Sequence, residues 1–172
     1  MNKGTFITLY NQIKTTGSLE ESVSCFWQTL LPRYFPSEDF MIGCEQRPGR
    51  NNLGRMDLVV STPDQNHQQK TVVFVVESKR REFAGRTAEW TAALEQLTEY
   101  LQNVRTSRRG QGHRIFHAAI AIGTYVRFYQ LNPSMDTVED LPSRDTGKAY
   151  ELQKDEMEIH EILTYLASAS AQ

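Results

Sequence analysis

The stretch TVVFVVESK, residues 71–79, constrains the fold of this chain more than any other segment. Every residue from Val72 to Val76 is apolar, so a strand formed here presents apolar side chains on both of its faces. Strands of this kind lie inside sheets that carry helices on each side. The run therefore predicts a buried strand near the centre of an α/β sheet.

The rest of the chain supplies the helices and the other strands of such a sheet. Apolar residues repeat at helical spacing in residues 4–15, 18–34, 87–105 and 154–168. Strand patterns cover residues 39–46, 55–61, 115–122 and 126–131, with a hairpin turn expected at Gly123 and Thr124. The expected order is α-α-β-β-β-α-β-β-α, which is a mixed sheet with helices on its faces. With 172 residues, we expect a single domain over 1–172, with a core at about 18–131 and a C-terminal helix at about 154–168.

Two local features of the helix that follows residue 18 can be read from its first turn. Ser18 and Glu21 have the spacing of a capping box, in which each side chain accepts a hydrogen bond from the other's backbone N–H. Glu20 has no such explanation, because it lies three residues before Val23 and so points toward the apolar face. Cys25 falls on the apolar pattern of this helix and Cys44 on a strand pattern. This predicts two buried thiols in a reducing compartment.

Charge and hydropathy limit the classes of partner. The net charge is −2, but Arg47, Arg50, Arg55, Lys79, Arg80, Arg81 and Arg86 fall close together in the sequence. Such a local basic surface suits a polyanionic substrate, and scattered solvated arginines are an equally weighted alternative. The N-terminal MNKGTFITLYNQ has no apolar core of signal-peptide length, and no apolar run is long enough to span a membrane. We therefore expect an intracellular protein, cytoplasmic or nuclear, with no membrane partner.

Three charged residues interrupt the apolar strands. Asp57 lies in the strand at 55–61, and Glu77 and Lys79 end the strand at 71–79, on the same face. A hairpin of these two strands can bring Asp57 beside Glu77. Two adjacent carboxylates repel unless a cation relieves them, and hard oxygen ligands suit Mg²⁺ or Mn²⁺. A lysine beside them can hold a water and stabilise charge on phosphorus, so the trio predicts a phosphodiester hydrolysis site. The alternative for Glu77 and Lys79 is a simple surface ion pair.

These motifs resemble the PD-(D/E)xK nuclease superfamily, whose restriction-endonuclease-like fold is a three-layer α/β/α sandwich with an αβββαβ core. Asp57 matches the acidic residue of the second strand, and Glu77-Ser78-Lys79 matches the (D/E)xK motif. Gln96 and Tyr100 match the QxxxY helix motif of RecB-like and type I restriction nucleases. ESKR, the later QL and Tyr100, and GTYVRFYQL are most similar to small fungal-type members. Met56 stands where the family has proline, while Arg55 keeps the basic residue two places before Asp57.

The resemblance implies a Mg²⁺- or Mn²⁺-dependent endo- or exonuclease. Asp57, Glu77 and the backbone carbonyl of Ser78 would bind the metal, and Lys79 would orient the attacking water. Many members carry a further glutamate on the first core helix, for which Glu20 is the candidate. The substrate is expected to be nucleic acid, DNA in preference to RNA, and nucleases of this fold often act as homodimers. The implied substrate contacts are Arg55, Arg80, Arg81, Arg86, Gln96 and Tyr100, and Gln96 is also implied as a catalytic residue.

Two other functions stay open at this point. The superfamily contains members that are not shown to cut nucleic acid, so the chain is alternatively a binding module or an enzyme acting on a small molecule. A metal-free hydrolase would have to use His67, His113, His117 or His160. None of these histidines has a serine or cysteine partner at a recognisable spacing, which makes this the weakest of the three readings.

Overall fold

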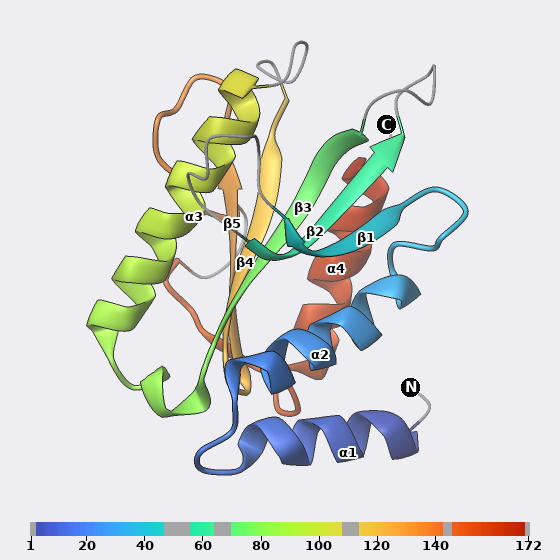
Figure 1. The fold of residues 1–172 in the computed structure, drawn as a ribbon, viewed down its shortest axis with the longest axis vertical. Helices are drawn as coiled ribbons and strands as arrows, with labels where there is room; N and C mark the ends of the chain where they lie inside the picture. The colour runs from blue at the N-terminus through green and yellow to red at the C-terminus, as the bar shows by residue number, and fades with distance from the viewer. Residues whose placement is uncertain (1–2, 47–55, 64–69, 108–113, 143–145, 171–172) are drawn as a thin grey trace.

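The computed structural model of the chain describes residues 3–46, 56–63, 70–107, 114–142 and 146–170 (Figure 1). Its helices are α1 (Lys3–Lys14), α2 (Glu20–Leu30), α3 (Thr87–Ser107) and α4 (Glu156–Ser170), with 3₁₀ turns η1 (Leu31–Arg33) and η2 (Arg81–Phe83). Its strands are β1 (Met41–Gln46), β2 (Met56–Pro63), β3 (Lys70–Lys79), β4 (Phe116–Ile122), β5 (Tyr125–Leu131), β6 (Glu139–Asp140) and β7 (Tyr150–Glu151). The expected order of elements is confirmed, and the two-residue strands β6 and β7 are additions to it.

The described strands form one mixed sheet in the order β1-β2-β3-β4-β5-β6, with β7 also paired to β5. Only the β3–β4 pair among them is parallel; the others are antiparallel. β3 thus has a neighbouring strand on each side and lies inside the sheet, as predicted. The hairpin of β4 and β5 turns at Gly123, whose φ of +59° is favoured by a residue without a Cβ.

Helices cover both faces of the sheet, which confirms the α/β class (Figure 1). On one face, α3 packs Trp90, Leu97 and Leu101 into a cluster with Val75 and Ile120 of the sheet. On the other face, α1, α2 and α4 share a second cluster with β3 and β5, which includes Phe6, Trp27, Phe74, Phe128 and Leu163. All residues from Val72 to Val76 are buried. The sheet is therefore the middle of three layers.

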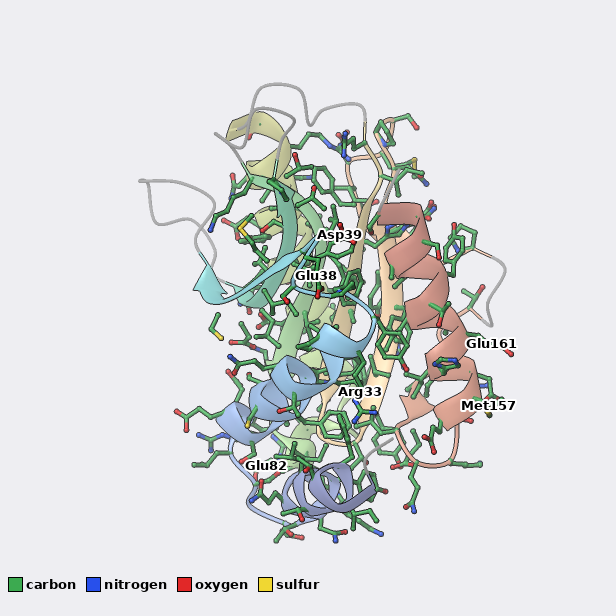
Figure 2. The ribbon with its side chains drawn as sticks, turned by 90° about the vertical axis from the view of Figure 1, so that its right-hand side faces the viewer. Arg33, Glu38, Asp39, Glu82, Met157 and Glu161 are labelled. Carbon is green, nitrogen blue, oxygen red and sulfur yellow. The ribbon has the colours of Figure 1, made fainter. Side chains whose placement is uncertain are left out.

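Helix α4 turns one side to the sheet and the other to solvent. Ile159, Ile162 and Leu163 are buried, whereas Figure 2 shows Met157 and Glu161 projecting from the side of α4 that faces away from the sheet. Among the described residues, no helix combines the length and the apolar character needed to cross a membrane.

Two local predictions are wrong. No capping box begins α2, because Leu19 occupies the N-cap position without a side-chain cap bond. Instead, Ser18 Oγ donates a hydrogen bond back to the Ile13 carbonyl, 3.3 Å away, and so serves the end of α1. The thiols are also exposed rather than buried. Cys25 lies outside the buried stripe of α2, and Cys44 lies on β1, the edge strand of the sheet.

Candidate active site

The end of β3 places a glutamate and a lysine against each other. Glu77 is only 1% exposed, and its Oε1 lies 2.5 Å from Lys79 Nζ. The parallel strand β4 runs beside them, with Ile120 in register with Glu77 and Ile122 with Lys79. The second carboxylate oxygen, Glu77 Oε2, is buried without a hydrogen-bond partner. Buried polar atoms are rarely left unsatisfied, so this oxygen marks a position where a further partner would stabilise the protein.

Asp57 reaches β3 from the neighbouring strand. The pairing of β2 with β3 begins at Leu58 and Val76, one residue beyond Asp57 and one before Glu77. Beyond that pair the Asp57 carboxylate takes the place of a backbone acceptor, and its Oδ2 accepts a hydrogen bond of 2.7 Å from Ser78 N–H. This bond explains why the strand carries an aspartate here. The hairpin prediction is confirmed by the antiparallel pairing of β2 with β3.

Glu20 is the first residue of α2 and is half-buried. Burial raises the pKa of its carboxyl; the charge of Lys79 lowers it and that of Asp57 raises it. Glu20 therefore lies within electrostatic reach of both strand residues, as its inward position on the helix predicts. Three carboxylates from α2, β2 and β3 thus act on the ammonium group of Lys79.

Burial governs the protonation of Glu77. It raises the pKa of this carboxyl to about 7, with Asp57 adding to the rise and Lys79 opposing it. For Lys79, burial alone would lower the pKa, but the nearby carboxylates of Glu77, Glu20 and Asp57 outweigh it, so the pKa is raised above 10.5. Near neutral pH the pair therefore consists of a charged lysine and a glutamate close to its titration midpoint, whose charge a cation would favour.

A cleft of about 450 Å³ opens between α2, β1 and β2 at this end of the sheet. Its lining includes Glu20, Asp57 and Arg80, together with Cys25 and Cys44. Sequence reasoning assigned no site role to several polar residues of this lining, namely Glu21, Ser24, Cys25, Gln28 and Cys44. The available signal is helical spacing, because Glu21, Ser24, Cys25 and Gln28 lie three or four residues apart on α2 and so share one helix face.

The remaining predicted substrate contacts are spread over different surroundings. Arg80 lines the cleft, whereas Arg86 holds its guanidinium over the Phe83 ring, 5.1 Å from the centroid. Arg81 packs against the turn between β4 and β5. Arg55 lies outside the described residues.

The two residues of the QxxxY motif lie on α3. Gln96 is half-buried, and Tyr100 is 1% exposed within the cluster between α3 and the sheet. Because the Tyr100 ring is covered by protein, it offers no surface for direct contact with a substrate. Its predicted substrate contact therefore stays a prediction, which the covered position of the ring does not favour.

The oxygen atoms available at the end of β3 are of the kind that a hard divalent cation prefers as ligands. Asp57 and Glu77 offer carboxylate oxygens, and Glu77 Oε2 is buried and has no other partner. Within the described part of the chain, however, no three His, Cys, Asp or Glu side chains are grouped closely enough to hold a metal. Any metal here would use two side chains and complete its shell with backbone oxygens or water, as Mg²⁺ commonly does.

The histidines that the structure describes do not join this site. His117 is buried on β4, and burial lowers its pKa to about 4, so it is neutral at physiological pH. His160 Nδ1 shares a hydrogen bond of 3.0 Å with the Tyr34 hydroxyl. Neither residue lines the cleft. His67 and His113 lie outside the described residues.

Comparisons with known proteins returned nothing: no protein-family model, no curated protein and no solved structure matches the chain.

Proposed function

We propose that the chain is a metal-dependent nuclease of the PD-(D/E)xK type that hydrolyses phosphodiester bonds of nucleic acid, DNA in preference to RNA. The observation that carries the proposal is the buried, unpartnered Oε2 of Glu77, beside Lys79 and next to the strand that bears Asp57. A glutamate buried in this way gains most from a cation, and phosphodiester hydrolysis is chemistry that such a cation assists. The αβββαβ order of the elements from α2 to β4 is consistent with the restriction-endonuclease-like fold.

Each residue has a distinct task in this proposal. Asp57 and Glu77, with the carbonyl of Ser78, hold Mg²⁺ or Mn²⁺. When bound, the metal neutralises charge on the phosphate and favours deprotonation of the attacking water. Lys79 orients that water and stabilises the charge that develops on the phosphoryl oxygens. Glu20 is the further carboxylate that faces these residues from α2.

Substrate binding in the proposal falls mainly to the cleft. Arg80 offers a guanidinium to the backbone phosphates at the edge of the cleft that Asp57 and Glu20 line. Arg81 and Arg86 follow Arg80 in the sequence and add positive charge to the same segment of the chain. Gln96 supports the site from α3. The proposal includes the association of two copies of the chain, so that each copy cuts one strand of a duplex.

The decisive experiment compares two lysine variants. Purified protein is incubated with single-stranded, duplex and branched DNA and with RNA, in Mg²⁺ or Mn²⁺. We expect cleavage by the wild type and by Lys154→Ala, an exposed control in the turn before α4, and loss of cleavage in Lys79→Ala. Intact substrates under all of these conditions, or undiminished cutting by Lys79→Ala, would remove the nuclease from consideration.

One observation favours the second candidate, a non-nucleolytic protein that keeps the fold as a binding module or for a small molecule. Among described residues no cluster of three ligand side chains is found, and Lys79 already occupies one oxygen of Glu77. Calorimetry with Mn²⁺ separates the candidates. Binding that Asp57→Asn and Glu77→Gln abolish supports the nuclease, and the lack of such binding supports the second candidate.

A further inference from the structure

The turn between β4 and β5 makes an unusually close contact with the segment that follows Lys79. A Cβ built on Gly123 would lie 2.5 Å from Arg81 Cβ and 2.6 Å from Arg81 Cα. Non-bonded carbon atoms do not approach so closely, and the second of these atoms belongs to the backbone. Any residue other than glycine at position 123 must therefore displace the chain at Arg81.

The same glycine also holds the end of β3 directly. Its backbone N–H donates a hydrogen bond of 3.1 Å to the Lys79 carbonyl. The turn therefore contacts the segment at two residues, through a hydrogen bond to Lys79 and through close packing against Arg81. Between these residues lies Arg80, whose side chain lines the cleft.

The turn is itself anchored from the part of the chain that follows β5. Leu152 N–H donates to the Thr124 carbonyl at 2.9 Å, and Glu151 of β7 is in register with Tyr125. Helix α1 joins the same anchor, because the Tyr10 hydroxyl donates a 2.8 Å hydrogen bond to Glu151 Oε1. Two elements outside the αβββαβ core, α1 and β7, thus brace the turn.

We propose that Gly123 is a positioning residue, which fixes the segment from Lys79 to Arg81 so that the Lys79 ammonium stays on Glu77 and Arg80 stays on the cleft. The catalytic value of fixing Lys79 and Arg80 rests on the proposed nuclease function. The effect of Gly123 on their positions does not depend on that function. The inference is therefore tested on the lysine and on the reaction separately.

The first test measures the reactivity of Lys79 in Gly123→Ala. An amine-acylating reagent at limiting concentration, read by mass spectrometry, gives the labelling rate of Lys79 relative to exposed Lys14 and Lys154. In the wild type Lys79 should label slowly, because its side chain is 20% exposed and held by Glu77. We expect a several-fold faster rate in Gly123→Ala.

Two other glycines provide matched controls. Gly17 and Gly147 also have positive φ, +83° and +72°, but a Cβ on either meets nothing within 4 Å. Gly17→Ala and Gly147→Ala therefore introduce backbone strain of the same kind without the collision. Both should leave the relative labelling rate of Lys79 at the wild-type value, which isolates the contact with Arg81 as the cause.

A second pair of variants keeps the inference falsifiable if Gly123→Ala does not fold. Arg81→Gly removes the Cβ and Cγ atoms that meet the turn, whereas Arg81→Ala removes the guanidinium and keeps Cβ in place. We expect faster labelling of Lys79 in Arg81→Gly and near wild-type labelling in Arg81→Ala. Unchanged labelling in Arg81→Gly, or in a folded Gly123→Ala, overturns the inference.

Cleavage supplies the readout that depends on the proposed function. If the wild type cuts nucleic acid, Gly123→Ala should lower kcat by a larger factor than it changes KM, since Lys79 acts on the water rather than on substrate binding. An unchanged kcat in folded Gly123→Ala overturns the inference. If the wild type cuts nothing, the nuclease proposal fails, and the labelling rates still decide whether Gly123 positions Lys79.

Discussion

The carboxylate of Asp57 and the backbone N–H of Ser78 are joined by a hydrogen bond of 2.7 Å that links β2 to β3. Ser78 is fully buried, so its N–H depends on a protein acceptor at this point. Asp57 therefore has a structural task that is independent of any metal. A simple Asp57→Ala variant would confuse that task with metal binding.

Substitution by asparagine separates the two tasks of Asp57. Asp57→Asn keeps a side-chain oxygen that can accept from Ser78, whereas Asp57→Ala leaves a buried N–H unpaired at a cost of about 1–3 kcal/mol. We expect urea denaturation to show this loss in Asp57→Ala and little loss in Asp57→Asn. Mn²⁺ binding by calorimetry should fall in both variants. Retention of Mn²⁺ binding in Asp57→Asn would leave Asp57 with the structural task alone.

The raised pKa of Glu77 predicts a pH-dependent stability. Since burial raises this pKa from its usual 4.5 to about 7, the folded protein keeps a proton that the unfolded chain releases between these values. The contribution of Glu77 to the free energy of unfolding therefore falls as pH rises through this window. The full destabilisation from the buried charge is present above pH 7. Glu77→Gln removes it, and should raise the free energy of unfolding above pH 7 by on the order of 2 kcal/mol.

The same variant should have little effect on stability below pH 4.5, where Glu77 is protonated in both states. Urea denaturation of wild type and Glu77→Gln across this range provides the measurement, with exposed Glu161→Gln as the control. If the difference in stability between wild type and Glu77→Gln does not change with pH, the expected burial of a charge at Glu77 is contradicted.

The position of Arg80 predicts a specific salt dependence. Arg80 lines the cleft, and Arg86 stacks on Phe83 outside it, although the two lie close in sequence. A lost phosphate contact lowers the slope of log affinity against log salt concentration by ~1. Arg80→Ala should show this decrease and Arg86→Ala should show a smaller one, in DNA-binding titrations over a range of salt concentrations. Equal slopes in both variants would indicate that the cleft does not hold the phosphates.

The exposed thiols allow the cleft to be blocked chemically. Cys25 and Cys44 both line it, and a maleimide adduct on either side chain would occupy part of its 450 Å³. We expect treatment with N-ethylmaleimide to weaken nucleic-acid binding by about tenfold, ~1.4 kcal/mol. The double variant Cys25→Ser/Cys44→Ser should bind normally and resist the reagent. Full binding by the modified wild type would place the substrate elsewhere on the surface.

Residues 71–79 illustrate what the sequence could predict. A continuous apolar run needs no partner to identify it, and the strand is seen at Lys70–Lys79. Likewise, the apolar repeat at 87–105 predicts α3. The three-residue spacing between Glu20 and Val23 predicts that Glu20 points inward, and its side chain is half-buried and lines the cleft. The two-residue strands β6 and β7 left no such pattern, because their pairing depends on β5 rather than on their own residues.

The errors share one physical origin, which is the influence of neighbouring elements that a local sequence pattern does not contain. Ser18 suits an N-cap, but the end of α1 takes its hydroxyl. Cys44 lies on an apolar strand pattern, yet an edge strand is covered less than a central one. The close contact between Gly123 and Arg81 cannot be predicted from the sequence either, because these residues become adjacent only when β4 pairs with β3.

The parallel pairing of β3 with β4 has a consequence for the order of folding. A hairpin forms from neighbouring residues, but two parallel strands meet only after the chain has returned along the whole of α3. Contacts of this kind close long loops and form slowly. Glu77 and Lys79 can thus be in their strand well before the Gly123 amide reaches the Lys79 carbonyl. Recovery of the proposed cleavage during refolding should therefore lag behind recovery of the β2–β3 hairpin, and report the closing of the long loop.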